Sequence, residues 1–331
     1  MKHANISIFV PHLGCPNDCS FCNQRHITGR STEPCAEDIR NAVSVAVSSR
    51  NFSAKSCEIA FFGGSFTAID REYIHHLLTV AAEEVNKYGL RGIRISTRPD
   101  CISAEILNVL KQYSVTAIEL GAQSMDDEVL ALNDRGHTSK QVVTASKLIR
   151  EFGFELGLQM MTGLFGDTDE KAINTALKIA ALKPDTVRIY PTIVLKNTRL
   201  AALYNEGKYI PQNLDDAVSL VVRLQDIFIR EDIKIIRIGL HSIEEDSFVA
   251  GPWHPAFCEL CDSKRFLDDI LSKCEPHKAY EIEVNPLDIS KAVGQKKANL
   301  NTLSNLHINV KFIQNKDITL NTIKVREVNQ D

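Results

Sequence analysis

Three cysteines stand close together near the start of the chain, in the segment CPNDCSFC that begins at Cys15. Three residues separate Cys15 from Cys19, and two separate Cys19 from Cys22. Iron–sulfur clusters select thiolate sulfur, and three thiolates can hold three of the four irons of a [4Fe–4S] cluster. The fourth iron stays open to a small molecule, so the spacing predicts chemistry and not only electron storage. The alternatives are a zinc site completed by His12 or His26, and three unrelated buried thiols.

The elements that must position these cysteines alternate along the chain. The predicted strands, read from short apolar runs, are 6–10, 58–62, 92–97, 116–120, 154–161 and 186–191. The predicted helices, read from apolar residues at helical spacing, are 36–49, 73–88, 104–113, 139–152 and 168–182. This alternation predicts an α/β fold with a parallel sheet covered by helices, which places chemistry at the carboxyl ends of its strands. A helix at 214–230 and a strand at 233–238 are expected to extend or close the sheet.

Length and composition limit the class of protein. The 331 residues suffice for one barrel-sized domain and a small appendage, and the 44% hydrophobic and 24% charged content is typical of a globular protein. No apolar run reaches the ~20 residues of a membrane span, and the first residues do not resemble a signal peptide. Nine cysteines suit a reducing compartment, so we expect a cytoplasmic protein without a membrane partner. The net charge of −4 argues against nucleic-acid binding over the whole surface.

The cysteine pattern, with the aromatic Phe21 before the last cysteine, resembles the signature of the radical S-adenosylmethionine (SAM) family. The resemblance implies a [4Fe–4S] cluster and SAM as cofactors, with SAM chelating the open iron. It also implies an electron donor such as flavodoxin or ferredoxin, and reductive cleavage of SAM to a 5′-deoxyadenosyl radical. The fold that it implies is a (β/α)6 partial TIM barrel, which we expect over residues 1–240.

Further segments resemble the radical SAM domain in the catalytic subunit of Elongator. They are STRPD at 96–100, ELGAQS at 119–124, NDRGHT at 133–138 and RIYPTIV at 188–194. Elongator catalytic subunits space their cluster cysteines more widely and carry a C-terminal acetyltransferase domain, and the printed sequence shows neither feature. We therefore do not expect acetyl-CoA-dependent carboxymethylation of tRNA from this chain.

The resemblance also implies a SAM site built from residues at strand ends. Arg135 is expected to pair with the SAM carboxylate, because a guanidinium fork makes two hydrogen bonds to a carboxylate. Gly63 and Gly64 are expected to let the backbone approach the methionine part of SAM closely. The remaining expected contacts are Ser65, which replaces a glutamate of the family motif, together with Ser96, Gln123, Gln159 and Leu164.

Two of these positions depart from the family pattern. Gln159 lies where related enzymes often have an acidic residue that holds the ribose hydroxyls, so that contact is weakened or moved. Leu164 lies in the segment MTGLFG, which takes the place of a GLPG turn whose backbone edges the adenine. Phe165 replaces the proline of that turn.

Residues 241–331 are expected to form a separate C-terminal α/β module. A helix at 258–274, a strand at 280–284, two helices joined by a glycine turn and a strand at 308–313 resemble the core of a KH domain. The second glycine of the KH loop is replaced by Lys297, which with Lys296 is expected to meet RNA phosphates. The alternative is a cap that covers the barrel or mediates dimer contacts.

Further cysteines in this region leave a second metal site open. Its ligands would be Cys258 and Cys261 with His254 and Cys274. The alternative is that these cysteines are buried thiols without a function.

Three functions follow from these observations. The first is a radical SAM enzyme that acts on RNA or tRNA by hydrogen abstraction. The second keeps this chemistry but has a small-molecule or peptide substrate, as in coproporphyrinogen-oxidase-like relatives. The third is a cluster-bearing binding or regulatory protein that does not cleave SAM. The sequence names no catalytic residue that acts on the substrate.

Overall fold

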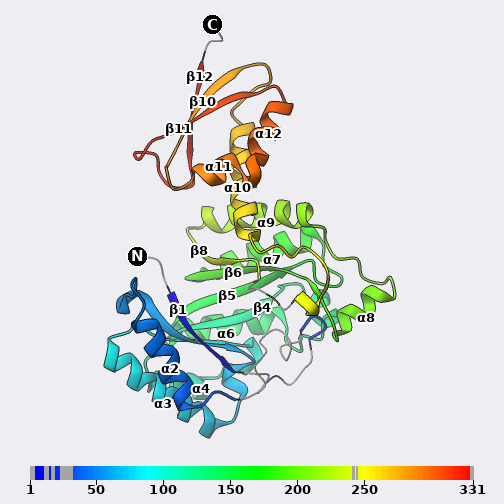
Figure 1. Cartoon of the computed structure of the whole chain (residues 1–331). Coiled ribbons are helices and arrows are strands. Elements are labelled where there is room, and N and C mark those ends of the chain that lie inside the picture. Colours follow the sequence, from blue (N-terminus) through cyan, green and yellow to red (C-terminus); the bar gives the residue numbers. More distant parts are fainter. Residues whose placement is uncertain are drawn as a thin grey trace.

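A curled parallel sheet forms the main body of the computed structural model, which describes residues 4–10, 15, 19–22, 33–240, 243 and 245–328. Its seven strands follow the order β1-β2-β3-β4-β5-β6-β8, so β1 and β8 are its edges (Figure 1). The strands are β1 (Ala4–Val10), β2 (Cys57–Gly63), β3 (Gly92–Thr97), β4 (Val115–Gln123), β5 (Glu155–Thr162), β6 (Thr186–Pro191) and β8 (Lys234–Ile238). The predicted partial barrel is confirmed, and the strand expected at 233–238 extends its edge beside β6.

Helices cover one side of this sheet (Figure 1). They are α2 (Ala36–Val47), α3 (Arg71–Tyr88), α4 (Ala104–Lys111), α6 (Ser139–Glu151), α7 (Asp169–Ala181) and α9 (Leu214–Arg230), whereas the shorter α5 (Asp127–Leu132) and α8 (Arg199–Asn205) pack in smaller clusters outside this core. Alternate strand residues such as Ile93, Ile95 and Leu158 enter the core beneath these helices. Helix α5 is absent from the sequence-based expectations, because its six residues are too few to show a helical period.

The other side of the sheet carries charged side chains that pair with one another. Arg94 donates from Nε to Glu58 across 2.8 Å and from Nη1 to Glu119 across 3.2 Å. Arg188 pairs with the same Glu119, with 2.8 Å between Nε and Oε2. All four side chains are buried, so each charge depends on its partners for compensation. This network ties β2, β3, β4 and β6 together below the strand ends.

Side-chain caps and apolar stripes define the helices. In α9, Val221, Leu224 and Phe228 lie on the buried stripe, and Asn213 accepts a hydrogen bond from the backbone of Asp216 across 2.8 Å. Acidic residues in its first turn and Arg230 in its last complement the helix dipole. Short elements complete the body: strands β7 (Val194–Leu195) and β9 (Phe248–Ala250), and the single-turn helices η1 (Ala54–Ser56), η2 (Phe66–Ala68), η3 (Pro99–Cys101) and η4 (Glu245–Ser247).

The C-terminal module lies beyond α9 (Figure 1). It contains α10 (Phe257–Leu271), β10 (Ala279–Val284), α11 (Ile289–Val293), η5 (Gln295–Lys297), α12 (Ala298–Asn305), β11 (Asn309–Gln314) and β12 (Ile323–Val328). Strand β10 pairs in parallel with β11 and antiparallel with β12, a strand that the sequence analysis did not anticipate. The expected helix, turn, helix and strand are present, so an α/β module is confirmed.

Helix α10 contributes to two hydrophobic cores. Phe257 and Cys261 join the core of the barrel, whereas Phe266 and Ile270 join the core of the C-terminal module. The domain limits at 240 and 241 stay a prediction. Among the described residues, no helix has both the length and the apolar character needed to cross a membrane.

Candidate functional site

The three cysteines follow the carboxyl end of β1. Cys19 is buried, Cys15 and Cys22 are half-buried, and the backbone N–H of Cys22 donates to the carbonyl of Cys19 across 3.0 Å. Burial raises the pKa of Cys15, and the charge of Cys19 adds to this rise. Hydrogen bonding from the backbone of Ser65 and the charge of Arg98 oppose it. The thiol of Cys15 therefore lies within electrostatic reach of Cys19 and beside the turn after β2.

A buried hydrogen-bond pair fastens the cysteine segment to the barrel. The hydroxyl of Ser20 donates to Oδ1 of Asn133 across 2.7 Å, and the backbone of Ser20 donates to the carbonyl of Asn133 across 3.1 Å. Asn133 in turn donates from Nδ2 to the carbonyl of Phe165 across 2.9 Å. Both Ser20 and Asn133 are fully buried. Sequence reasoning missed this pair, although Asn133 stands only two positions before the expected site residue Arg135.

Arg135 reaches the cysteines directly. Its Nη1 donates to the sulfur of Cys19 across 3.0 Å, and its Nη2 donates to the carbonyl of Gly121 across 2.7 Å. A side chain at position 121 would meet Arg135, since an ideal Cβ there lies 3.4 Å from Nη2. The structure thus places Arg135 at the thiols, and its pairing with a SAM carboxylate stays a prediction.

The glycine turn after β2 packs against the end of β1. Gly63 has φ +115°, and an ideal Cβ on it would lie 2.2 Å from the carbonyl oxygen of Val10. The backbone N–H of Gly64 donates to that same oxygen across 3.0 Å. Only glycine fits this close approach, which sets the point where the chain leaves β1 toward the cysteines.

Ser65 belongs to a cluster of hydroxyl groups that sequence reasoning did not identify. Its Oγ shares a hydrogen bond of 2.8 Å with Oγ1 of Thr97, which shares another of 2.6 Å with Oγ1 of Thr67. Ser65 is 1% exposed, so its hydroxyl is committed to this cluster and its backbone is the part that faces Cys15.

The expected contacts on β3, β4 and β5 lie on the charged side of the sheet, opposite the helices. Alternation along the strands places Ser96, Gln123 and Gln159 on this side. Nε2 of Gln159 donates to Oε1 of Gln123 across 3.4 Å, so the structure brings these two amides together. Ser96 is half-buried. Leu164 is buried against Met161, so of its groups only the backbone suits the expected adenine contact.

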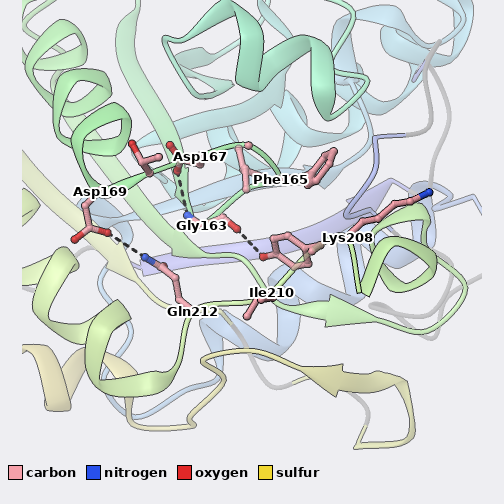
Figure 2. A pocket seen from close by; sticks show the side chains of 11 residues that line it. Gly163, Phe165, Asp167, Asp169, Lys208, Ile210 and Gln212 are labelled. Carbon is pink, nitrogen blue, oxygen red and sulfur yellow. Dashed lines mark hydrogen bonds between the residues drawn. The ribbon is translucent and has the colours of Figure 1, made fainter. Parts of the chain in front are cut away.

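A cavity of about 450 Å³ lies beside the turn that contains Leu164 (Figure 2). The hydroxyl of Tyr209 donates to the carbonyl of Gly163 across 2.6 Å, and the backbone N–H of Gly163 donates to Oδ2 of Asp167 across 3.1 Å. Burial raises the pKa of Asp167 to about 6. Neither the three cysteines nor Arg135 lines this cavity, so it is separate from the thiol site.

The residues at the thiols fit a [4Fe–4S] cluster. The guanidinium of Arg135 donates to the sulfur of Cys19 and acts electrostatically on Cys15, and Arg98 adds a second buried cation near Cys15. Guanidinium donors and positive charge are what an anionic thiolate cluster needs around it. Among the described residues, no three His, Cys, Asp or Glu side chains gather around the position of one metal ion. A [4Fe–4S] cluster does not require that, because each thiolate binds a different iron.

The possible ligands of a second metal site do not all lie together: Cys258 and Cys261 are one turn apart on α10, but Cys274 belongs to another core. Cys261 lies in the core of the barrel and Cys274 in the core of the C-terminal module. Nδ1 of His254 accepts a hydrogen bond from the backbone of Ala256 across 3.0 Å. Cys261 and Cys274 are buried as core thiols are, whereas Cys258 is exposed.

Comparison with solved structures supports the fold. The Elp3 protein of the archaeon Methanocaldococcus infernus, solved with an N-terminal deletion, superposes with a TM-score of 0.67 at 20% identity. The superposition covers 83% of this chain and 65% of that one.

Named relatives are matched over part of their length. The tRNA uridine(34) acetyltransferase of Dehalococcoides mccartyi is 27% identical over 62% of this chain and 52% of its own length. Human Elongator complex protein 3 is 31% identical over 52% of this chain and 35% of its own length. An uncharacterised protein of Methanocaldococcus jannaschii is 26% identical over 75% of this chain and 74% of its own length. The chain therefore spans about half or less of the two relatives that carry a functional name.

Two family models match the chain. The model of the radical SAM superfamily matches residues 9–179, more than half of the 331 residues, and a model of the radical SAM C-terminal domain matches residues 184–265. The first match contains the cysteine segment, the glycine turn and Arg135. The chain therefore belongs to the radical SAM superfamily and is an enzyme, and part of it is similar to Elongator complex protein 3.

Proposed function

We propose that this protein holds a [4Fe–4S] cluster through Cys15, Cys19 and Cys22, cleaves SAM reductively, and acts on tRNA. When bound, the cluster supplies one electron that breaks the bond between the sulfur and C5′ of SAM, which gives methionine and the 5′-deoxyadenosyl radical. That radical takes a hydrogen atom from the substrate. A small electron-transfer protein of the flavodoxin or ferredoxin class supplies the electron.

One observation carries this proposal: the 3.0 Å hydrogen bond from Arg135 to the sulfur of Cys19. It joins the cysteine segment after β1 to the segment after α5 and, through Gly121, to the end of β4, where Gln123 is one of the expected SAM contacts. Arg135 is buried, and its second nitrogen is fixed by Gly121. In this role, Arg135 would hold the carboxylate of SAM, Gln123 and Gln159 would bind the ribose side, and the turn at Leu164 would edge the adenine. Gly63, Gly64, Ser65 and Ser96 line the methionine side.

Support for tRNA as the substrate comes from two sources. Relatives named tRNA uridine(34) acetyltransferase and Elongator complex protein 3 share the barrel segment. The C-terminal module has the strand, helix, turn, helix and strand order of a KH core, with two lysines in the turn. Lys296 and Lys297 have φ values of 51° and 64°, and neither forms an ion pair with a described residue. On the adjoining sheet, by contrast, Lys311 and Arg326 both pair with Glu281.

SAM cleavage is tested by anaerobic reconstitution with iron and sulfide, followed by dithionite and SAM. Protein with about four irons per chain should release 5′-deoxyadenosine and methionine. Substitution of Cys15, Cys19 or Cys22 by Ala should abolish both cluster and product. Cys35→Ser is the matched control, because Cys35 is an exposed thiol outside the motif. A fully loaded protein that releases no 5′-deoxyadenosine would exclude the enzymatic proposal and favour a cluster-bearing binding protein.

The tRNA proposal is tested by binding measured at several salt concentrations. For every phosphate that a lysine no longer neutralises, the slope of log affinity against log salt should become shallower by about 0.7 to 0.9. The double variant Lys296→Glu and Lys297→Glu should show about twice this decrease, whereas Lys311→Glu, on the ion-paired sheet, should keep the original slope. An unchanged slope in the double variant would remove the module from the tRNA proposal and favour a small-molecule or peptide substrate.

A further inference from the structure

Arg98 is a buried guanidinium that sequence reasoning did not assign to the site. It follows β3 directly and is 4% exposed. Its Nε donates to Oδ1 of Asp100 and its Nη2 donates to Oδ2, each across 2.9 Å, so the guanidinium and the carboxylate form two parallel hydrogen bonds. Its remaining nitrogen, Nη1, is buried and has no hydrogen-bond partner within the described part of the chain.

Arg98 also holds the groups that surround the thiols. Its Nη2 donates to the backbone carbonyl of Arg135, whose side chain donates to Cys19. Its backbone N–H donates to Oγ of Ser65 across 3.3 Å. Burial raises the pKa of Cys15, and the charge of Arg98 opposes this rise. Burial lowers the pKa of Arg98, but its hydrogen bonds to Asp100 and the charges of Asp100, Cys19 and Cys101 raise it overall. Arg98 is therefore within electrostatic reach of two of the three cysteines.

The paired charges of Arg98 and Asp100 act on the site with opposite signs. A buried cation such as Arg98 stabilises the more negative, reduced form of a nearby cluster, and a carboxylate such as that of the half-buried Asp100 destabilises it. Burial matters here because solvent screens such interactions much less in the interior. Among the described residues, Nη1 has no partner with hydrogen-bond geometry, and the thiol of Cys101 lies close to the same guanidinium.

We infer that Arg98 is a positioning residue which, with Asp100, sets the reduction potential of the cluster and fixes Arg135 against Cys19. This inference rests on the proposed cluster site. The reduction concerned is the uptake of one electron by the cluster from an external donor, dithionite in the test.

The test is a redox titration of reconstituted protein, followed by the electron paramagnetic resonance signal of the reduced cluster. Arg98→Gln should shift the midpoint potential to more negative values, because it removes the cation. Asp100→Asn should shift it to more positive values, because it removes the carboxylate and keeps an acceptor for Arg98. Arg98→Lys keeps the charge without the fork, and its shift should be smaller than that of Arg98→Gln.

Opposite shifts of the midpoint potential in Arg98→Gln and Asp100→Asn indicate an electrostatic effect, because structural damage would shift the potential of both variants in the same direction. Arg71→Gln is the control, because Arg71 pairs with Glu105 on the surface and should leave the potential unchanged. Iron content is measured for each variant. If Arg98→Gln does not take up the cluster, the shifts of the midpoint potential in Arg98→Lys and Asp100→Asn test the inference. Shifts of the same sign, or none, in loaded variants would overturn the inference even if the protein cleaves SAM. Opposite shifts in a protein that makes no 5′-deoxyadenosine would leave the inference intact and overturn the proposed function.

Discussion

The guanidinium of Arg135 donates a hydrogen bond to the sulfur of Cys19 across 3.0 Å, although 116 positions separate the two residues in the sequence. The contact forms because the segment before α6 returns to the end of β1 over the carboxyl edge of the sheet. The backbone carbonyl of Arg135 accepts a hydrogen bond from Arg98, and the side chain of Arg135 donates one to the carbonyl of Gly121. The carboxyl edge of the sheet thereby gathers thiols and buried cations at one place.

Loss of the Arg135 fork should weaken SAM binding. Charge-assisted hydrogen bonds contribute about 1.5–3 kcal/mol, so Arg135→Gln should raise the Kd for SAM by about tenfold to a hundredfold. Equilibrium dialysis of SAM against the iron-loaded variant measures this. Arg150→Gln, at an exposed position of α6, is the control and should bind SAM normally. Unchanged affinity in Arg135→Gln would show that another group holds the carboxylate.

Removal of Asn133 should loosen the cysteine segment. Asn133→Ala leaves the buried hydroxyl of Ser20 without its 2.7 Å acceptor and the carbonyl of Phe165 without its donor. An unsatisfied buried polar group costs about 1–3 kcal/mol, so the free energy of unfolding should fall by about that much. Urea unfolding measures this. Ser20→Ala should cost less, because it removes only one partner of this chain of bonds.

Gly63→Ala should lower the stability of the fold far more than the same substitution at Gly89. The new Cβ would overlap the carbonyl oxygen of Val10, and the residue would keep φ +115°. Strain of this kind costs about 1–3 kcal/mol even before the steric overlap is counted. Gly89→Ala is the control, because Gly89 has φ +64° with no atom within 4 Å of an added Cβ. Its cost should stay near 1–2 kcal/mol. Equal melting temperatures for the two variants would contradict the steric argument.

Ionisation of the buried Asp167 should lower the free energy of unfolding as the pH rises. Burial raises its pKa to about 6 in the folded state, above the unfolded value of about 3.9. The folded state therefore binds the proton more tightly, and stability is lost as the pH rises from about 4 to about 6. Asp167→Asn should remove this dependence and stabilise the protein by about 1–3 kcal/mol at pH 7.5, with a smaller gain at pH 5. Urea unfolding at the two pH values checks this. Asp169→Asn is the exposed control, and a gain for Asp167→Asn that is the same at both pH values would contradict a titration of Asp167.

The sequence by itself determined the architecture of the barrel and the chemical type of the site. Alternating helices and apolar strands allow little else than a parallel sheet covered by helices, because each apolar face must be buried. The spacing of Cys15, Cys19 and Cys22 is a local property that is visible without coordinates. Arg135 and Gln123 were also identifiable, since they lie in segments that resemble those of a known family.

Only the tertiary structure decided which groups meet. The bonds from Arg98 to Asp100 and to Arg135, and from Ser20 to Asn133, depend on the geometry of loops at the edge of the sheet. Apolar periodicity reports which face of an element is buried, but it carries no information about which polar groups become partners there. Ser65 is an example: the sequence places it in the glycine turn after β2, but only the structure shows that its hydroxyl is hydrogen-bonded to Thr97. Burial then forces such groups to find partners, because an unpaired polar group in the interior is costly.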